Sequence, residues 1–308
     1  MLLAPAVCAQ KKVQTDSNKS AVIIVGAGGE PEYAKQFEAW TTELRSALTD
    51  RFGFDTKNLI VLPNAKATDV RDTFSQLKTK LDSNNILFVF LIGHGSFDGK
   101  ESKFNLVGPD LAASEYNALL SSVPTKRVVV FNMASASGEF VKSLSAKGRI
   151  VITATRSGQE TNATRFAGFF IAALNATDAD TDQDGHTSIL ETFVYANRLT
   201  ADFYTRAGRL ATEHALLEDN GDGVGREKAE AGEGLLARAT YLDSLSLDEA
   251  AANVATGKLL KERKRLEGEI EQLIARKTNM PETEYEATLE RLFIELAKVN
   301  RSIKQAGS

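Results

Sequence analysis

Short apolar segments alternate with amphipathic segments over the first half of the chain. The runs 21–25, 86–92 and 128–131 are almost wholly aliphatic or aromatic, which is typical of strands buried on both faces of a sheet. The segments between such runs, for example 31–51, place apolar side chains at helical spacing. Strands that alternate with helices predict an α/β fold with a mostly parallel sheet and helices on both faces.

From residue 247 onward the composition shifts to Leu, Glu, Lys and Arg, with apolar positions every three or four residues. The pattern stops once, around Pro281, and then continues to Ile303. Because proline cannot continue a helix and suits a turn, we expect residues 259–305 to form a C-terminal antiparallel helical hairpin. Its apolar seam with charged flanks allows two roles. The hairpin either caps the surface of its own domain, or pairs as a coiled coil with a partner or a second copy.

These patterns divide the chain into three parts. Residues 1–18 form a leader and linker, 19–240 an α/β domain, and 247–308 the helical hairpin. The leader ends in small residues around Cys8 and resembles the tail of a secretory signal peptide, although a basic start is missing. We therefore expect export, to the periplasm or the cell exterior. Cys8 is the only cysteine, so removal of the leader leaves a mature protein without a thiol.

Composition excludes two classes of partner. The chain has 308 residues, a net charge of -4 and interspersed acids and bases, so it lacks the basic footprint of a nucleic-acid-binding protein. No apolar run is long enough to span a bilayer, so no transmembrane segment is expected.

The most specific motif is an acidic loop at residues 180–191. It matches an EF-hand-type calcium loop at positions 1, 3, 5, 9 and 12, with glycine at position 6, through Asp180, Asp182, Asp184, Ser188, Glu191 and Gly185; His186 would contribute only its backbone carbonyl. Carboxylates at alternate positions supply the hard oxygen ligands that calcium prefers, and helical patterns flank the loop. We predict calcium as a cofactor. A solvated acidic turn is the alternative, and magnesium fits less well because so many protein oxygens crowd the site.

A second acidic stretch at 218–223 resembles the first half of such a loop. Its position-12 acid is missing, because Ala229 stands there. This stretch is either a weaker cation site or an acidic turn.

Polar residues follow two of the predicted buried strands. His94 lies between Gly93 and Gly95 after the strand 86–92, and Ser135 follows the strand 128–131. The carboxyl ends of parallel strands meet at one edge of a sheet, where ligand and catalytic groups gather. We therefore expect His94 and Ser135 at the same edge. Each has a structural alternative, as a satisfied histidine and as a small residue in a tight turn.

These two segments resemble the His-Gly and Ala-Cys-x-Ser-Gly motifs of the caspase-like peptidases, above all the legumain family. The order, the spacing of the two motifs and the preceding apolar strands agree, and the resemblance covers residues 20–205. It implies a caspase-like fold in which His94 stands at the catalytic histidine. The backbone amides of Gly95 and Ser135 would then be the oxyanion donors.

The chain departs from this family at the nucleophile, because Ser135 stands where the family has cysteine. A thiol is partly ionised near neutral pH and a hydroxyl is not, so a serine needs a base hydrogen-bonded to it. The sequence thus favours a calcium-binding pseudopeptidase that binds peptide or protein partners. An active hydrolase that uses a Ser135–His94 pair is the alternative, so enzymatic activity stays open.

Three further residues follow the next predicted strand. Arg156, Ser157 and Arg165 could line the same cleft, where an arginine could bind a carboxylate. Ordinary surface cations are the alternative for the two arginines.

Overall fold

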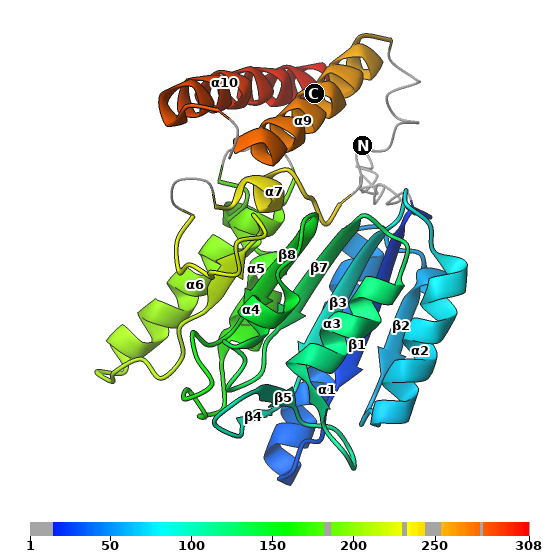
Figure 1. Ribbon diagram of the computed structural model, residues 1–308, viewed down its shortest axis with the longest axis vertical. Coiled ribbons are helices and arrows are strands. Elements are labelled where there is room, and N and C mark those ends of the chain that lie inside the picture. Colours follow the sequence, from blue (N-terminus) through cyan, green and yellow to red (C-terminus); the bar gives the residue numbers. More distant parts are fainter. Residues whose placement is uncertain (1–14, 182–185, 230–232, 244–253, 278–279, 308) are drawn as a thin grey trace, which may run out of the picture.

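The computed structural model describes residues 15–181, 186–229, 233–243, 254–277 and 280–307. Its centre is a six-stranded sheet in the order β2-β1-β3-β7-β8-β9, in which every neighbouring pair is parallel except β8 and β9. The strands of this sheet are β1 (Lys19–Val25), β2 (Leu59–Leu62), β3 (Ile86–Ile92), β7 (Arg127–Asn132), β8 (Arg149–Thr153) and β9 (Leu216–Glu218). The predicted α/β class with a mostly parallel sheet is confirmed (Figure 1).

Helices cover both faces of this sheet (Figure 1). One face packs against α1 (Pro31–Ser46), which continues as a π-helical turn η1 (Ala47–Arg51), and against α5 (Phe166–Asn175) and α6 (Ile189–Arg206). The other face packs against α2 (Ala67–Lys80), α3 (Ala113–Ser122) and α4 (Phe140–Leu144). Short helices complete this part of the chain: η2 (Thr56–Asn58), η3 (Thr177–Ala179) and α7 (Leu235–Arg238).

The continuous apolar strands are explained by this two-sided burial. Along β1, Ile23 points into the core on the α1 side, while its neighbours Val22 and Ile24 point into the core on the α2 side. All three are fully buried. A strand with a helix layer on each face has no solvent-facing positions, so the alternation of polar and apolar residues disappears.

A small antiparallel sheet was not predicted from the pattern. It consists of β4 (Gly95–Phe97), β5 (Ser102–Phe104) and β6 (Leu111–Ala112). Because β6 takes up Leu111 and Ala112, α3 begins at Ala113. Pairing between such short segments leaves no periodic signal in the sequence.

The C-terminal region forms the predicted pair of helices, α9 (Val254–Arg276) and α10 (Glu282–Gly307). They have an apolar core of their own, built around Leu266, Ile270 and Leu292. Figure 1 shows this hairpin beyond the end of the sheet that lies opposite β4 and β5. Within the described part of the chain, no helix combines the length and the apolar character needed to cross a membrane. Residues 1–14, which include Cys8, lie outside the described residues.

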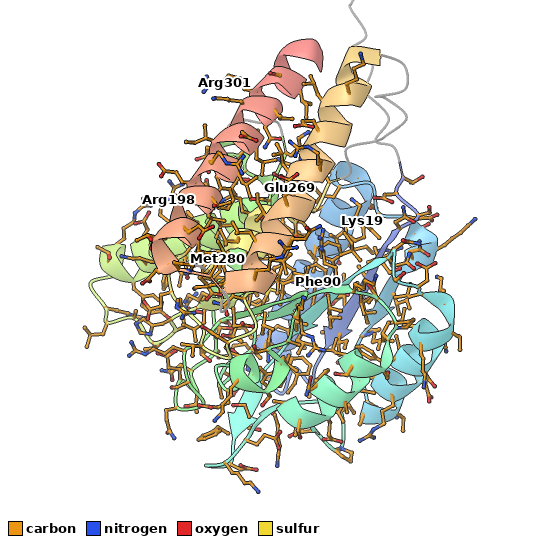
Figure 2. All side chains as sticks on the ribbon, turned by 45° about the horizontal axis from the view of Figure 1, so that its top comes forward. Lys19, Phe90, Arg198, Glu269, Met280 and Arg301 are labelled. Atoms are coloured by element: carbon orange, nitrogen blue, oxygen red, sulfur yellow. The ribbon has the colours of Figure 1, made fainter. Side chains whose placement is uncertain are left out.

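Lys19 is a buried cation at the start of β1 (Figure 2). It is 2% exposed, and its Nζ donates to the carbonyl oxygens of Phe52 (3.0 Å) and Leu242 (2.5 Å). Burial lowers the pKa of Lys19 from 10.5 to about 8, while the charges of Asp16 and Asp243 oppose the shift. The ammonium therefore links the first strand to the segment that precedes the hairpin, at an electrostatic cost.

The lowered pKa of Lys19 predicts that the stability of the fold depends on pH. Below pH 8 the ammonium is charged in both folded and unfolded chains, and its burial costs roughly 3 kcal/mol. Between pH 8 and 10.5 the folded chain releases the proton first, so the free energy of unfolding rises with pH. Urea unfolding at pH 7 and pH 10 should show this rise for the wild type relative to Lys19→Met. Parallel pH profiles of the two proteins would contradict the assignment.

Candidate functional site

The carboxyl ends of the central strands bring three loops to one edge of the sheet. In register, Leu91 of β3 lies beside Asn132 of β7, which in turn lies beside Thr153 of β8. The chain therefore leaves all three strands at the same level. This register places His94 and Ser135 at the same edge, as the strand pattern led us to expect.

The hydroxyl of Ser135 is enclosed by the backbone of Gly95. Ser135 is 2% exposed. Its Oγ accepts a hydrogen bond from the Gly95 amide at 3.1 Å and donates to the Gly95 carbonyl at 3.2 Å. The hydroxyl proton is thus directed to a backbone oxygen. The Gly95 amide, which the family resemblance implies as an oxyanion donor, is itself bonded to the Ser135 side chain.

Glycine is required at position 95 by this close approach. A Cβ atom there would lie 2.3 Å from the carbonyl oxygen of Ser135 and 3.0 Å from that of Lys103. Real Cβ atoms do not approach backbone oxygens this closely. The glycine beside His94 therefore serves the packing of two loops and does not by itself indicate catalysis.

The loop after Ser135 is fixed by the loop after β8. Ala136 has a left-handed backbone with φ 51°, and its amide donates to the Glu160 carbonyl at 2.7 Å. The hydroxyl of Thr155 accepts from the amides of Ser137 (2.7 Å) and Gly138 (3.1 Å). Left-handed geometry is costly for alanine, so these bonds must hold the turn in place.

The imidazole of His94 packs among aromatic rings of α1. Its centroid lies 4.7 Å from that of Tyr33 and 5.1 Å from that of Phe37, both edge-on. Burial lowers the pKa of His94, opposed by a hydrogen bond with the Gly28 backbone and by the charge of Glu30. The hydrogen bonds described for the chain include none between His94 and Ser135. The two side chains share an edge of the sheet but have different partners.

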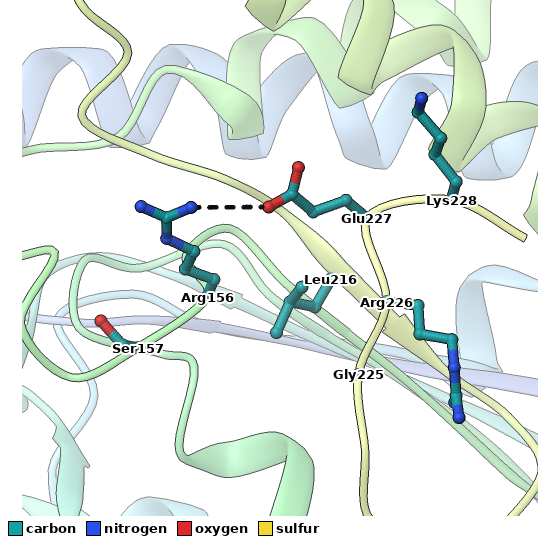
Figure 3. Close-up of a pocket in the computed structure, with 7 residues that line it drawn as sticks. All are labelled: Arg156, Ser157, Leu216, Gly225, Arg226, Glu227 and Lys228. Carbon is teal, nitrogen blue, oxygen red and sulfur yellow. Dashed lines mark ion pairs between the residues drawn. The ribbon is translucent and has the colours of Figure 1, made fainter.

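A groove of about 660 Å³ lies at the end of β8, between the loop after that strand and the segment 225–228. Figure 3 shows the residues that line it: Arg156, Ser157, Leu216, Gly225, Arg226, Glu227 and Lys228. The guanidinium of Arg156 lies 3.3 Å from Glu160 and 3.8 Å from Glu227. This groove is joined to the Ser135 loop, because the position of a Cβ on Gly138 would be 2.2 Å from the amide nitrogen of Ser157.

Arg165, expected in the same cleft, has other surroundings. Its guanidinium lies 4.4 Å from the ring centroid of Phe203. Its amide and that of Phe166 donate to the buried carboxylate of Glu213, which thereby holds the first turn of α5. Burial raises the pKa of Glu213, and these hydrogen bonds oppose the shift. Arg165 thus belongs to the packing of α5 and not to the residues that line the groove.

A histidine–carboxylate pair lies beside the groove and was not predicted. His214 Nδ1 is 2.5 Å from Glu160 Oε1, and the His214 amide donates to Oε2 at 3.2 Å. Glu160 Oε2 also accepts the amide of Arg156. The carboxylate therefore ties the chain after β8 to the chain before β9. The two residues are 54 positions apart, so no local spacing in the sequence could reveal the pair.

At the calcium-loop motif, the structure describes both ends of 180–191, and Asp182 and Asp184 lie outside the described residues. Glu191 is 9% exposed and its carboxylate is turned into the loop. Oε1 accepts from the amide and the hydroxyl of Thr181, at 2.9 and 3.0 Å, and Oε2 from those of Ser188, at 3.0 and 2.8 Å. Glu191 thereby joins the two ends of the loop between η3 and α6.

A second segment pairs with the end of this loop. The amide of Ile189 donates to the Thr240 carbonyl at 2.9 Å, and the amide of Leu242 donates to the Thr187 carbonyl at 3.2 Å. His186 Nδ1 lies 2.5 Å from a carboxylate oxygen of Asp243. The imidazole of His186 thus has a carboxylate partner, while the sequence assigned only its backbone carbonyl to the ion.

The acidic stretch 218–223 is built as a buried turn. The carboxylate of Asp219 accepts the amides of Gly234 and Ala237, both at 2.8 Å, and Glu233 is paired with Arg226. Burial, together with the nearby charge of Asp219, raises the pKa of Glu233 to about 8. Among the residues described, no three His, Cys, Asp or Glu side chains are arranged to hold a metal ion. The hydrogen bonds of Asp219 and the ion pair of Glu233 are those of a buried acidic turn.

No family model matches the chain, and no curated protein matches it in sequence. Solved structures of similar architecture include two proteins that match along most of their own length. A structural genomics protein from Geobacter sulfurreducens has a TM-score of 0.46 and 15% identity, over 65% of this chain and 92% of that one. Caspase-1 from Spodoptera frugiperda has a TM-score of 0.44 and 12% identity, over 68% and 88%. Similarity at this level concerns the arrangement of sheet and helices and assigns no activity.

The contact between Gly95 and Ser135 can be tested by adding one methyl group. Gly95→Ala should destabilise the chain by about 1–3 kcal/mol, because the new Cβ overlaps a backbone oxygen that cannot move freely. Gly268→Ala is the matched control, since its Cβ would meet no atom within 4 Å. This substitution should increase the free energy of unfolding by about 0.5–1 kcal/mol, because alanine favours a helix more than glycine does. Chemical unfolding measures both. Equal effects of the two substitutions would contradict the close approach.

Proposed function

We propose that this chain is a calcium-binding protein of caspase-like fold that binds a peptide or protein partner without cleaving it. The observation that carries the proposal is the position of the Ser135 hydroxyl, which is buried and bonded to both backbone groups of Gly95. Sequence resemblance puts this residue where related peptidases have their nucleophile. In this chain, the burial of Ser135 and its two bonds to Gly95 are typical of a residue that stabilises a turn.

Nucleophilic use of Ser135 would need a base to take its proton. A serine hydroxyl becomes nucleophilic only when a base accepts its hydrogen bond and a third group orients that base. The Ser135 proton is directed to the Gly95 carbonyl, and the imidazole of His94 packs against Tyr33 and Phe37. These contacts support binding as the function in preference to peptide hydrolysis.

The groove beside Ser157 supports the binding part of the proposal. It lies at the edge of the sheet where ligands of open α/β proteins are usually found, and arginine and lysine side chains border it. Arg156 is about half exposed and lines the groove, with Glu160 at 3.3 Å and Glu227 at 3.8 Å as its ion-pair partners. An extended peptide or surface loop that carries a carboxylate fits these groups, because a guanidinium can bind a carboxylate with two hydrogen bonds.

Calcium would have a structural role at the loop 180–191. Glu191 and Asp180 stand at the two ends of the loop, and the hard oxygen ligands of the motif match the chemistry of calcium. A loop of this kind is well suited to an exported protein, because extracellular calcium modules act at high ambient calcium. Export remains part of the proposal and derives from the leader-like start of the sequence.

A hydrolase is the second candidate, and one observation favours it. His94 and Ser135 lie at one edge of the sheet, with the Gly95 amide 3.1 Å from the Ser135 hydroxyl. A modest rotation of the Ser135 side chain would free that amide for an oxyanion. The two candidates differ in whether the Ser135 hydroxyl ever reacts.

Reactivity of Ser135 can be measured directly with a fluorophosphonate probe and a panel of fluorogenic peptides. We expect no labelling and no turnover by the wild type, because the hydroxyl is buried and lacks a base. Ser135→Cys should gain measurable peptide cleavage, since a thiol ionises near neutral pH. Ser157→Ala is the control, because this serine lines the groove but does not follow β7. Labelling of the wild type that Ser135→Ala abolishes would establish the hydrolase instead.

Calcium binding can be measured by titration calorimetry and thermal unfolding. A ligand that binds only the native state stabilises it by roughly 2.7 kcal/mol at a free concentration one hundred times the dissociation constant. Glu191→Gln should weaken the response strongly, because it removes the bidentate carboxylate. Asp222→Asn should have little effect, because Asp222 belongs to the second acidic stretch, where it pairs with Arg226. No heat and an unchanged melting curve in millimolar calcium would leave the loop as a solvated acidic turn.

A further inference from the structure

The loop that follows α6 projects from the body of the molecule, at the lower left of Figure 1. Every residue of this loop, 205–211, is exposed. Leu210 at its tip is 91% exposed, the highest value among the large exposed hydrophobic side chains described. At Gly208, even an added Cβ atom would meet nothing within 4 Å. The tip therefore exposes an apolar side chain at a protruding point of the fold.

The base of the loop is held by the end of the helix. The amide of Gly208 donates to the carbonyl oxygen of Thr205 at 3.1 Å, and the amide of Arg209 donates to that of Tyr204 at 3.0 Å. Gly208 has the left-handed conformation, with φ 60°, which is typical of the residue that ends a helix. The phenol of Tyr204 also hydrogen-bonds to Thr212 on the other side of the loop, at 2.9 Å. Bonds on both sides thus fix where the tip lies.

Three arginines lie at this end of α6. Arg206 is in the last turn of the helix and Arg209 precedes Leu210 in the loop, and both are exposed. The guanidinium of Arg165 stacks on Phe203, one helical turn before Arg206. Among the ion pairs of the described residues, none involves Arg206 or Arg209. Two cations therefore flank the apolar tip.

Carboxylates near this end of α6 do not cancel these charges at the surface. Asp202 lies one turn before Arg206, and Glu213 follows the loop. Glu213 is 3% exposed, and it accepts the amides of Arg165 and Phe166. Its charge is thus turned toward the interior. The whole chain has a net charge of -4, so an exposed cationic tip is a local feature with the opposite sign.

We propose that the loop 205–211 docks on an anionic lipid surface, with Arg206 and Arg209 at the headgroup phosphates and Leu210 inserted among the acyl chains. Arginines at a helix C-terminus complement the helix dipole, and a single exposed leucine is ordinary. Their combination at a protruding tip matches the cationic contacts and apolar insertion that hold peripheral proteins on a bilayer. A bilayer also accepts such a tip without a matching cavity, which a protein partner would have to supply.

Docking through this loop brings the groove close to the lipid surface. His214, which follows the loop, pairs with Glu160 beside the groove, and Leu216 lines the groove itself. A partner that binds there would then be one presented near a membrane. This consequence rests on the proposed function, whereas the docking of the loop does not require any partner in the groove.

Sedimentation of the full chain with lipid vesicles tests the role of the charges. The wild type should bind vesicles of phosphatidylcholine with phosphatidylglycerol, and much less to phosphatidylcholine alone. Added salt should weaken the binding, because it screens exposed charges. Arg209→Glu should lower the partition constant roughly tenfold or more, because attraction to the anionic surface becomes repulsion. Arg301→Glu makes the same change of charge at an exposed position of the distant hairpin, so it should leave the constant unchanged.

The role of the apolar tip is tested at Leu210. Leu210→Asp should weaken binding to the anionic vesicles, because an aspartate does not enter the acyl region. Val224→Asp is the matched control, since Val224 is 54% exposed on a different loop. An environment-sensitive dye on Leu210→Cys, in a chain with Cys8→Ser, should shift its emission to the blue when these vesicles are added. The dye reports on insertion even if the aspartate variant is not folded by circular dichroism.

Three results would overturn the proposal. The first is a wild type that does not sediment with the anionic vesicles. The second is binding that Arg209→Glu and Leu210→Asp leave unchanged, with no shift of the dye, which would assign the contact to another surface. The third is binding to soluble polyglutamate but not to vesicles, lost in Arg209→Glu, which would indicate an acidic protein as the partner of this loop.

Discussion

The parallel pairing of β3 with β7 is the constraint on which the rest of the candidate site depends. It brings the chain after each strand to the same level at one edge of the sheet. The backbone of Gly95 therefore hydrogen-bonds to the side chain of Ser135. Both strands are buried on both faces, and their register cannot slip without moving every side chain to the wrong layer. The register of the core strands therefore fixes where the site residues lie.

The positions of His94 and Ser135 and the contacts of their side chains have to be considered separately. His94 and Ser135 lie at the edge where the parallel strands end, which is where ligand and catalytic groups of open α/β sheets gather. Their side chains, however, take part in packing: one among the aromatic rings of α1, the other in the turn that carries Ala136. Backbone contacts and the close approach at Gly95 hold these loops in place, so the position of a residue in the fold does not by itself assign it a function.

Charged residues are arranged differently at the carboxyl edge of the sheet and at the end near the hairpin. At the carboxyl edge, Glu160 pairs with Arg156 within its own loop and with His214 of the segment before β9. Toward the hairpin, a buried ammonium, a histidine–aspartate pair and a stacked arginine surround the segment 240–243. Buried charges are costly unless they are bonded, so each of them fixes the position of its partner. The hairpin is attached where these charges lie.

The sequence by itself determined the class of the fold, the buried strands and the paired C-terminal helices, because continuous apolar runs and helical spacing reflect burial directly. It also placed His94 and Ser135 at strand ends and predicts a calcium loop at 180–191, since both patterns depend on residues close together in the chain. Only the tertiary structure decided the partners. The pair of Glu160 with His214, the stack of Arg263 on Tyr241 and the bond from Lys19 to Leu242 join residues that are 54, 22 and 223 positions apart. Such contacts arise from the packing of whole elements, and no local pattern encodes them.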